Sequence, residues 1–182
     1  RAARRVWARL LKETYGAQDP RSQQLRIFAF TAGSTLTAQQ PMNNLARTSV
    51  EATVAALAGV QTLHVSAYDE ALGVPTATAA TLALRTQQVV AFETGLTQTL
   101  DPFAGSYAVE QLTDELESSI WSLMEDIEQR GGALEAIDSG RFARDLAEAA
   151  YPHSQAVESG ERVVVGVNKF PSETEPLEVF EI

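Results

Sequence analysis

The chain contains no cysteine, only two histidines, and no long uninterrupted apolar run. The lack of cysteine excludes disulfide bonds and thiolate metal ligands, and it is compatible with a cytoplasmic location, which we expect. His64 and His153 lie too far apart in the sequence for the ligand spacing of a metal site, so we predict none. No segment approaches the roughly 18 consecutive apolar residues that cross a membrane, and we therefore expect no membrane association.

Positive charge is also scarce, because 14 Lys and Arg residues face 24 Asp and Glu residues and give a net charge of −10. A nucleic-acid surface must neutralise phosphates with Lys and Arg, so this balance argues against nucleic-acid binding. Several of the few basic residues crowd the first predicted helix, and we interpret them as a solvated helix face in preference to an anion site. These residues are Arg1, Arg4, Arg5, Arg9 and Lys12.

The sequence does contain a strand–loop–helix pattern that occurs three times. Strands are predicted at residues 25–32, 60–67 and 96–100, and the helices that follow them at 45–57, 76–93 and 109–129. Alternate residues of a strand point to opposite faces, and residues 25–32 have few polar side chains in either set. This strand is therefore predicted to be buried on both faces. Strands that alternate with helices predict a parallel β/α architecture.

Other segments lie outside this repeat. We predict a helix from the start of the chain to Tyr15, short helices over 133–140 and 141–160, a strand over 162–170, and an extended acidic tail over 171–182. The first residue lies within a helical pattern without a cap before it, so we expect the chain to be part of something longer. A closed parallel barrel requires eight strands and about 250 residues, so three repeats need further polypeptide to close.

Three phrases in fixed order occupy the predicted loops and the helix starts. They are LTAQQPMNNLART at residues 36–48, HVSAYDEALGVPT at 64–76, and DPFAGSYAVEQLT at 101–113. Together they resemble the adenosylcobalamin-dependent acyl-CoA mutases, the family that includes methylmalonyl-CoA mutase. The resemblance extends from about Arg5 to the GVNKF segment at residues 166–170, and so covers nearly the whole chain.

The resemblance implies an α/β fold, a partial parallel β/α (TIM-type) barrel with a helical C-terminal extension and tail. Residues 1–132 would be the later half of the barrel, and residues 133–182 the extension. The family's cobalt-binding signature, Asp-x-His-x-x-Gly, is absent from the chain. We therefore expect the cobalamin-binding domain downstream or on another chain, the other half of the barrel upstream or on another chain, and an oligomeric assembly.

The implied activity is that of an isomerase, which catalyses a radical carbon-skeleton rearrangement of an acyl-CoA with adenosylcobalamin as cofactor. The substrate would be methylmalonyl-CoA or a related, bulkier acyl-CoA. A non-catalytic structural subunit of a heteromeric mutase is the alternative. A generic β/α domain with a loop-borne phosphate or sugar site is a third interpretation, from the architecture alone.

The cofactor-binding residues that the resemblance implies lie in two loops. Glu70 matches the family glutamate that hydrogen-bonds the ribose of the adenosyl group, and Ser66 stands where many members have an asparagine that reaches the same group. Gly33 and Ala71 match positions where the backbone lies close to the corrin ring. Without the resemblance, Glu70 would be a residue stabilised near a helix N-terminus, and Gly33 an ordinary turn glycine.

The main departure from the family lies in the first strand of the repeat, where Phe28 and Phe30 replace a histidine and a glutamine that help to hold the acyl group. The resemblance places both phenylalanines in the barrel lumen, as substrate-binding residues for a more apolar acyl chain. Plain packing in the barrel core is the alternative. We assign Asn43 and Asn44 to helix-start and loop-tying hydrogen bonds, His64 to core or loop hydrogen bonding, and no residue to catalysis.

Overall fold

The computed structural model describes residues 1–172, which form two compact units. One unit consists of Arg1–Leu25 and Ala104–Val163. The other consists of Arg26–Phe103 and the segment that begins at Val164. The domain division expected from the sequence, 1–132 and 133–182, stays a prediction, and most of the expected acidic tail lies outside the described residues.

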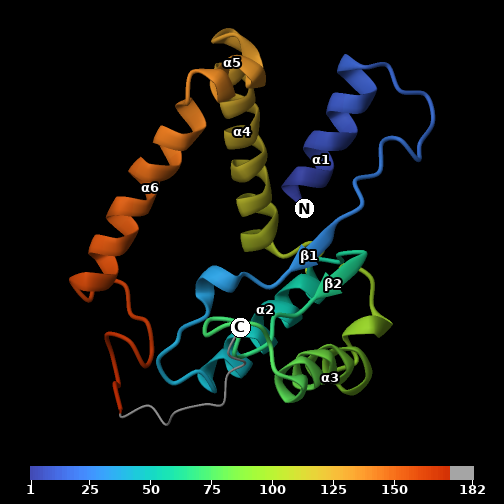
Figure 1. The fold of residues 1–182 in the computed structure, drawn as a ribbon. Helices are drawn as coiled ribbons and strands as arrows, with labels where there is room; N and C mark the ends of the chain where they lie inside the picture. The colour runs from blue at the N-terminus through green and yellow to red at the C-terminus, as the bar shows by residue number, and fades with distance from the viewer. Residues whose placement is uncertain (173–182) are drawn as a thin grey trace. The chain divides into compact units, whose positions relative to one another are not determined.

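Two parallel strands and two helices make up the unit that begins at Arg26. Strand β1 (Phe28–Phe30) is followed by α2 (Asn43–Leu57), β2 (Thr62–His64) and α3 (Ala77–Glu93). The strands pair in parallel with Phe28 opposite Thr62 and Phe30 opposite His64. This strand–helix–strand crossover, visible in Figure 1, confirms the parallel α/β class, although the described residues contain no closed barrel.

The core of this unit lies on one face of the sheet. Its buried side chains are small and come from α2, α3 and the residues that follow β2, with Leu63 packed against them; they are Ala52, Val65, Ala67, Ala79, Ala83 and Val90. Phe28 and Phe30 point to the opposite face and are 64% and 48% exposed. Burial on both faces was therefore a wrong prediction, because no described residue covers this second face.

The predicted helix at 76–93 is confirmed as α3, and its start is fixed by side chains. Thr76 is the N-cap residue, and its Oγ1 accepts a hydrogen bond of 3.3 Å from the Ala79 N–H. Asp69 Oδ2 in turn accepts hydrogen bonds from the Thr76 N–H and hydroxyl, at 2.9 and 2.8 Å. These bonds attach the loop after β2 to the first turn of α3.

Two predicted strands are absent from the described residues. Residues 96–100 contain a 3-10 helix at Leu96–Gln98, which begins after Gly95 with a φ of 73°. The predicted strand at 162–170 is a tight loop in which Gly166 has a φ of 81° and Asn168 Oδ1 accepts a bond from the Val164 N–H. A left-handed glycine and an amide that competes for backbone donors both interrupt an extended strand.

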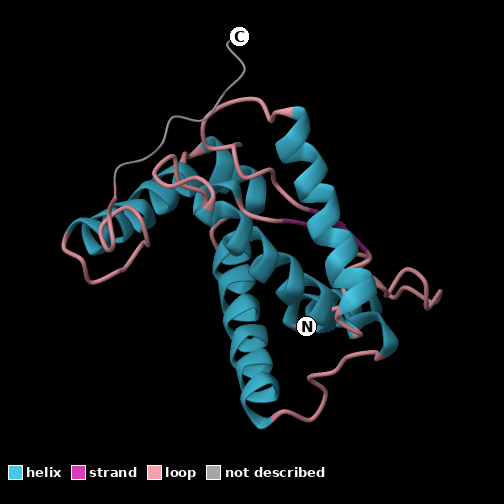
Figure 2. Cartoon of the chain, turned by 90° about the horizontal axis from the view of Figure 1, so that it is seen from below, coloured by secondary structure: helices cyan, strands magenta, loops and turns pink. Residues whose placement is uncertain are grey.

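The other unit is helical, as Figure 2 shows. Helix α1 (Ala2–Arg9) continues into a π-helical turn at Leu10–Thr14 and packs against α4 (Tyr107–Gln129). Helices α5 (Gly132–Asp138) and α6 (Arg141–Glu158) follow, in agreement with the two short helices predicted there. No helix within residues 1–172 is long and apolar enough to span a membrane.

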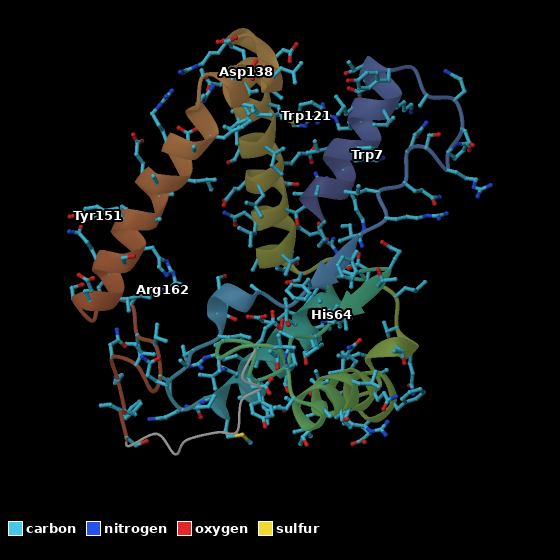
Figure 3. All side chains as sticks on the ribbon, in the orientation of Figure 1. Trp7, His64, Trp121, Asp138, Tyr151 and Arg162 are labelled. Atoms are coloured by element: carbon cyan, nitrogen blue, oxygen red, sulfur yellow. The ribbon has the colours of Figure 1, made fainter. Side chains whose placement is uncertain are left out.

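The basic face of α1 is exposed to solvent, as predicted, with the Arg5 and Arg9 side chains 46% and 53% exposed, and it also carries ion pairs that the sequence did not reveal. Arginines spaced four residues apart meet acids on α4 in a ladder of ion pairs, Arg1–Glu110 at 2.6 Å, Arg5–Asp114 at 2.7 Å, and Arg5–Glu117 and Arg9–Glu117 at 2.8 Å. Figure 3 labels Trp7 on α1 and Trp121 on α4, and the Arg9 guanidinium lies 5.3 Å from the Trp121 ring centre. Solvent-exposed ion pairs with acids on α4 therefore accompany this basic cluster.

Candidate functional site

The candidate site is built from the loops that follow β1 and β2, residues 31–42 and 65–76. Parallel strands place such loops at the same edge of the sheet, where ligands bind in β/α proteins. The two loops are joined directly: the Ser66 N–H donates to Thr31 Oγ1 at 2.8 Å, and the Ser66 hydroxyl donates to the Thr31 carbonyl at 3.0 Å. Ser66 is 1% exposed, so its hydroxyl serves this internal junction.

A second connection is made by Asn44, which is fully buried at the start of α2. Its amide group donates to the Thr37 carbonyl at 2.9 Å and to the Tyr68 carbonyl at 2.8 Å, and so binds both loops. Its oxygen accepts from the Thr37 N–H and from the Arg47 guanidinium. The predicted loop-tying role of Asn44 is confirmed, and Asn43 likewise bonds the nearby Gln40 side chain.

Gly33 and Glu70, one from each loop, are neighbours. A Cβ atom added to Gly33 would lie 3.5 Å from Glu70 Oε1, and Gly33 does not have a positive φ. The Glu70 carboxylate has no hydrogen bond or ion pair with any residue in the described part of the chain. Ala71, the next residue, is exposed. The structure thus brings together Gly33, Glu70 and Ala71, whereas Ser66 is buried beside them.

The exposed face of the sheet ends at the same edge. Phe28 and Phe30 on β1 share this face with Thr62 and His64 on β2, since all four are exposed and alternate with less exposed neighbours. The rings of Phe30 and His64 stack with centres 5.0 Å apart and planes inclined by 13°. His64 is therefore neither a core residue nor a loop-bonding one, which corrects its assignment from the sequence.

Sequence reasoning missed His64 because its neighbour depends on the strand register. Period-two alternation placed Phe28 and Phe30 on one face, but only the pairing of Phe30 with His64 places an imidazole beside them. The sequence did indicate that Thr62 and His64, two residues apart in one strand, lie on the same face of it. No group of three or more potential metal ligands occurs within residues 1–172.

These elements place the chain among the parallel β/α proteins, a class in which ligands bind at the carboxyl ends of the strands. The model for methylmalonyl-CoA mutase matches residues 1–182, and the chain belongs to that family. Enzymes of this family are isomerases that use adenosylcobalamin. The resemblance stated from the three phrases is thereby confirmed.

Relatives named for different activities align with almost all of the chain. It is 44% identical over 179 residues to the 2-hydroxyisobutanoyl-CoA mutase large subunit of Aquincola tertiaricarbonis, and 42% identical over 183 residues to methylmalonyl-CoA mutase of Escherichia coli K12. It is 38% identical over 175 residues to mitochondrial methylmalonyl-CoA mutase of Mus musculus. These matches cover 98%, 98% and 96% of this chain but only 32%, 26% and 23% of the relatives. The chain therefore spans about a quarter to a third of their length.

Proposed function

We propose that this chain forms part of a β/α barrel in an acyl-CoA mutase, with the exposed face of β1 and β2 directed into the barrel lumen. The observation that supports this most directly is the one-sided cover of the sheet. Helices α2 and α3 pack on one face, and the face with Phe28 and Phe30 is bare. In a β/α barrel the helices form the outer ring and the other strand face lines the interior.

Adenosylcobalamin, if bound, would supply the radical chemistry of the rearrangement. The residues at the strand ends are compatible with such a group in three respects: Glu70 has an unengaged carboxylate, Gly33 leaves open the space in front of it, and Ala71 presents only a methyl group. The Glu70 carboxylate would accept hydrogen bonds from sugar hydroxyls and so orient the adenosyl group. Ser66 does not fit a direct contact, because its hydroxyl already bonds Thr31.

Phe28 and Phe30 would pack against the acyl portion of the substrate and exclude water from it. Aromatic rings bury large apolar areas, and a water-free site protects reactive intermediates from side reactions. Methylmalonyl-CoA or a bulkier acyl-CoA is the proposed substrate. The remaining barrel strands and a cobalamin-binding domain would come from upstream or downstream sequence or from another chain, in an oligomeric, cytoplasmic enzyme.

A structural subunit of a heteromeric mutase is the second candidate. The observation that favours it is the internal use of Ser66, which removes one polar contact that the family resemblance implied for the adenosyl group. The unengaged carboxylate of Glu70 favours the catalytic candidate instead.

Optical and electron-spin spectroscopy of the complete enzyme tests the proposal. The full-length protein, with any partner subunit, would be loaded with adenosylcobalamin and mixed in turn with a panel of acyl-CoA thioesters. We expect one thioester to produce a paramagnetic cobalt signal coupled to an organic radical. Cofactor binding without such a signal for every thioester would contradict catalysis, and failure to bind cobalamin would favour the structural subunit.

A further inference from the structure

The tight loop around Gly166 is bonded to the loop that follows β1 and to the start of α2. The Gln40 side-chain amide donates to the Phe170 carbonyl at 3.0 Å, and the Arg47 guanidinium donates to the Val165 carbonyl at 2.7 Å. Gly166 is buried, and a Cβ atom added to it would lie only 3.0 Å from Gln40 Oε1. The tight loop and the loop after β1 are therefore packed so closely that a side chain at Gly166 would press on Gln40.

Hydrogen bonds hold this contact in one conformation. Within the 164–170 loop, the Gly166 N–H donates to the Lys169 carbonyl at 2.8 Å. Across the contact, Gln40 and Phe170 have φ values of 46° and 56°, a left-handed conformation that residues other than glycine rarely adopt. Such conformations persist where the surrounding contacts hold them, and they occur often at ligand sites. The 164–170 loop is therefore a fixed support for the loop after β1.

Arg47 extends this support to the second loop of the candidate site. Its Nη2 bonds the Val165 carbonyl, and its Nη1 donates to Asn44 Oδ1 at 2.7 Å. The Asn44 amide group donates in turn to the Tyr68 carbonyl at 2.8 Å. Tyr68 lies two residues before Glu70, so a continuous series of hydrogen bonds links the 164–170 loop to the backbone next to Glu70.

We infer that Arg47 and the 164–170 loop position Glu70 for its contact with the adenosyl group. This inference rests on the proposed function and deepens it, because it gives a role to residues outside the two loops of the site. Arg47 is a positioning residue, which acts through Asn44 and the backbone at Tyr68. Without Arg47, the Glu70 carboxylate would have to be ordered when the cofactor binds, and that ordering costs binding free energy.

Two cobalamins separate this effect from a general weakening of the site. Adenosylcobalamin carries the ribose that Glu70 would bond, whereas methylcobalamin has the same corrin ring without the adenosyl group. Both are titrated into the full-length enzyme and followed by absorbance. Arg47→Met should weaken adenosylcobalamin binding about tenfold, the usual effect of losing a hydrogen bond to a charged group. Methylcobalamin binding should stay unchanged.

The corrin side of the site should be unaffected because the residues around Gly33 are held separately. The Ala32 N–H donates to Glu51 Oε2 at 2.9 Å, and the Thr35 hydroxyl donates to Glu51 Oε1 at 2.7 Å. Neither bond involves Arg47. Equal losses of affinity for the two cobalamins would therefore show a general effect on the fold and would overturn the inference.

Arg85→Met is the matched control for Arg47→Met. Arg85 is exposed on α3, and its guanidinium donates to Gln88 of the same helix. Its replacement should change the affinity for neither cobalamin. Arg47→Lys keeps the charge and can still donate to one of the former acceptors, so it should retain part of the affinity for adenosylcobalamin.

Two glycines test the 164–170 loop itself. Gly166 and Gly160 have φ values of 81° and 80°, so alanine is equally strained at both positions. A Cβ atom at Gly160 would meet no atom within 4 Å, whereas one at Gly166 would press on Gln40. Gly166→Ala should therefore weaken adenosylcobalamin binding about fivefold by displacing this contact, and Gly160→Ala should not. Equal affinities in the two variants would contradict a role for the loop.

A combination with Glu70→Ala shows whether Arg47 acts through Glu70. Glu70→Ala removes the carboxylate and should weaken adenosylcobalamin binding alone. Adding Arg47→Met to it should cause no further loss, because the contact that Arg47 positions is already gone. Additive losses would mean that Arg47 acts independently of Glu70, and they would overturn the inference.

The failures of the two proposals are distinguishable. If the unsubstituted enzyme binds neither cobalamin, or if Glu70→Ala leaves adenosylcobalamin affinity unchanged, the proposed cofactor contact fails and the inference fails with it. If Glu70→Ala weakens adenosylcobalamin binding and Arg47→Met does not, the inference alone is overturned.

Discussion

Single residues at the strand ends can be tested with small changes, and Gly33 offers the most direct one. A methyl group there would make an ordinary contact of 3.5 Å with Glu70 Oε1, so Gly33→Ala should fold normally. It would nevertheless fill the space through which a cofactor reaches that carboxylate, and overpacking typically costs about 1–3 kcal/mol. We therefore expect about tenfold weaker adenosylcobalamin binding to the full-length enzyme, measured by optical titration.

Gly73 provides the control for that substitution. It lies in the same loop as Glu70, and a Cβ atom there would meet no atom within 4 Å. Gly73→Ala should therefore leave cobalamin affinity unchanged. Equal affinities for the two variants would remove Gly33 from the cofactor site.

Asn44 tests how the two loops are held together. Asn44→Ala leaves the Thr37 and Tyr68 carbonyls without their amide donor in a buried place. Each buried group left unsatisfied costs about 1–3 kcal/mol, so we expect about 2–3 kcal/mol of destabilisation. Urea unfolding of the full-length protein measures it, and faster amide hydrogen exchange in residues 31–42 and 65–76 would localise it. Asn43→Ala, which loses one hydrogen bond to Gln40, should destabilise the protein less than Asn44→Ala. A larger destabilisation by Asn43→Ala would show that Asn44 does not hold the two loops together.

At the scale of the elements, the packing of α1 against α4 depends on ion pairs between the two helices. The hydrogen bond from Arg9 lowers the pKa of Glu117 below its ordinary value of 4.5, burial opposes this shift, and the charges of Arg5 and Arg9 add to it. A carboxylate whose pKa is lowered by folding stabilises the fold fully above its unfolded pKa. That stabilisation is lost as the pH falls below 4.5 and through the lower folded-state value.

We therefore expect α1 to loosen from α4 in this acid range, seen as faster amide hydrogen exchange in residues 2–14 of the full-length protein. Glu117→Gln should speed exchange already at neutral pH and remove most of the acid dependence, because the ionisable partner of Arg9 is gone. Glu115→Gln is the control, since Glu115 is exposed on the same helix and its carboxylate accepts a hydrogen bond from Gln111 and forms no ion pair within residues 1–172. An unchanged acid profile in Glu117→Gln would mean that the ladder does not hold α1.

The helices could be predicted from the sequence to within a few residues, and the reason is local. The range 76–93 begins at a threonine cap, and 109–129 is followed by a left-handed Gly131 that ends it. The strands at 96–100 and 162–170 were wrong because a short apolar run becomes a strand only with a partner to pair with. Within the site, the parallel topology was enough to predict that the two loops meet. The stacking of Phe30 on His64 could not be predicted, because it depends on which residues of β1 and β2 lie opposite each other.

For the whole molecule, the bare strand face is the feature with the largest consequence. Within residues 1–172 each of the two strands has one unpaired edge, and the exposed face carries the apolar rings of Phe28 and Phe30 beside Thr62 and His64. Unpaired edges and exposed apolar patches favour association with other polypeptide. If this face lines a barrel, the rest of the enzyme must cover it, and that cover should be measurable at the two phenylalanines.

Hydroxyl-radical footprinting can compare the 182-residue chain produced alone with the full-length enzyme. We expect Phe28 and Phe30 to react in the isolated chain and to be protected in the complete enzyme. Phe92 on α3, which is 85% exposed, is the reference because it belongs to the helical layer and should not gain equal protection. Equal reactivity of Phe28 and Phe30 in both samples would mean that the face stays open to solvent in the enzyme. The strands would then not line a closed barrel, and the apolar face could not serve as a water-free substrate site.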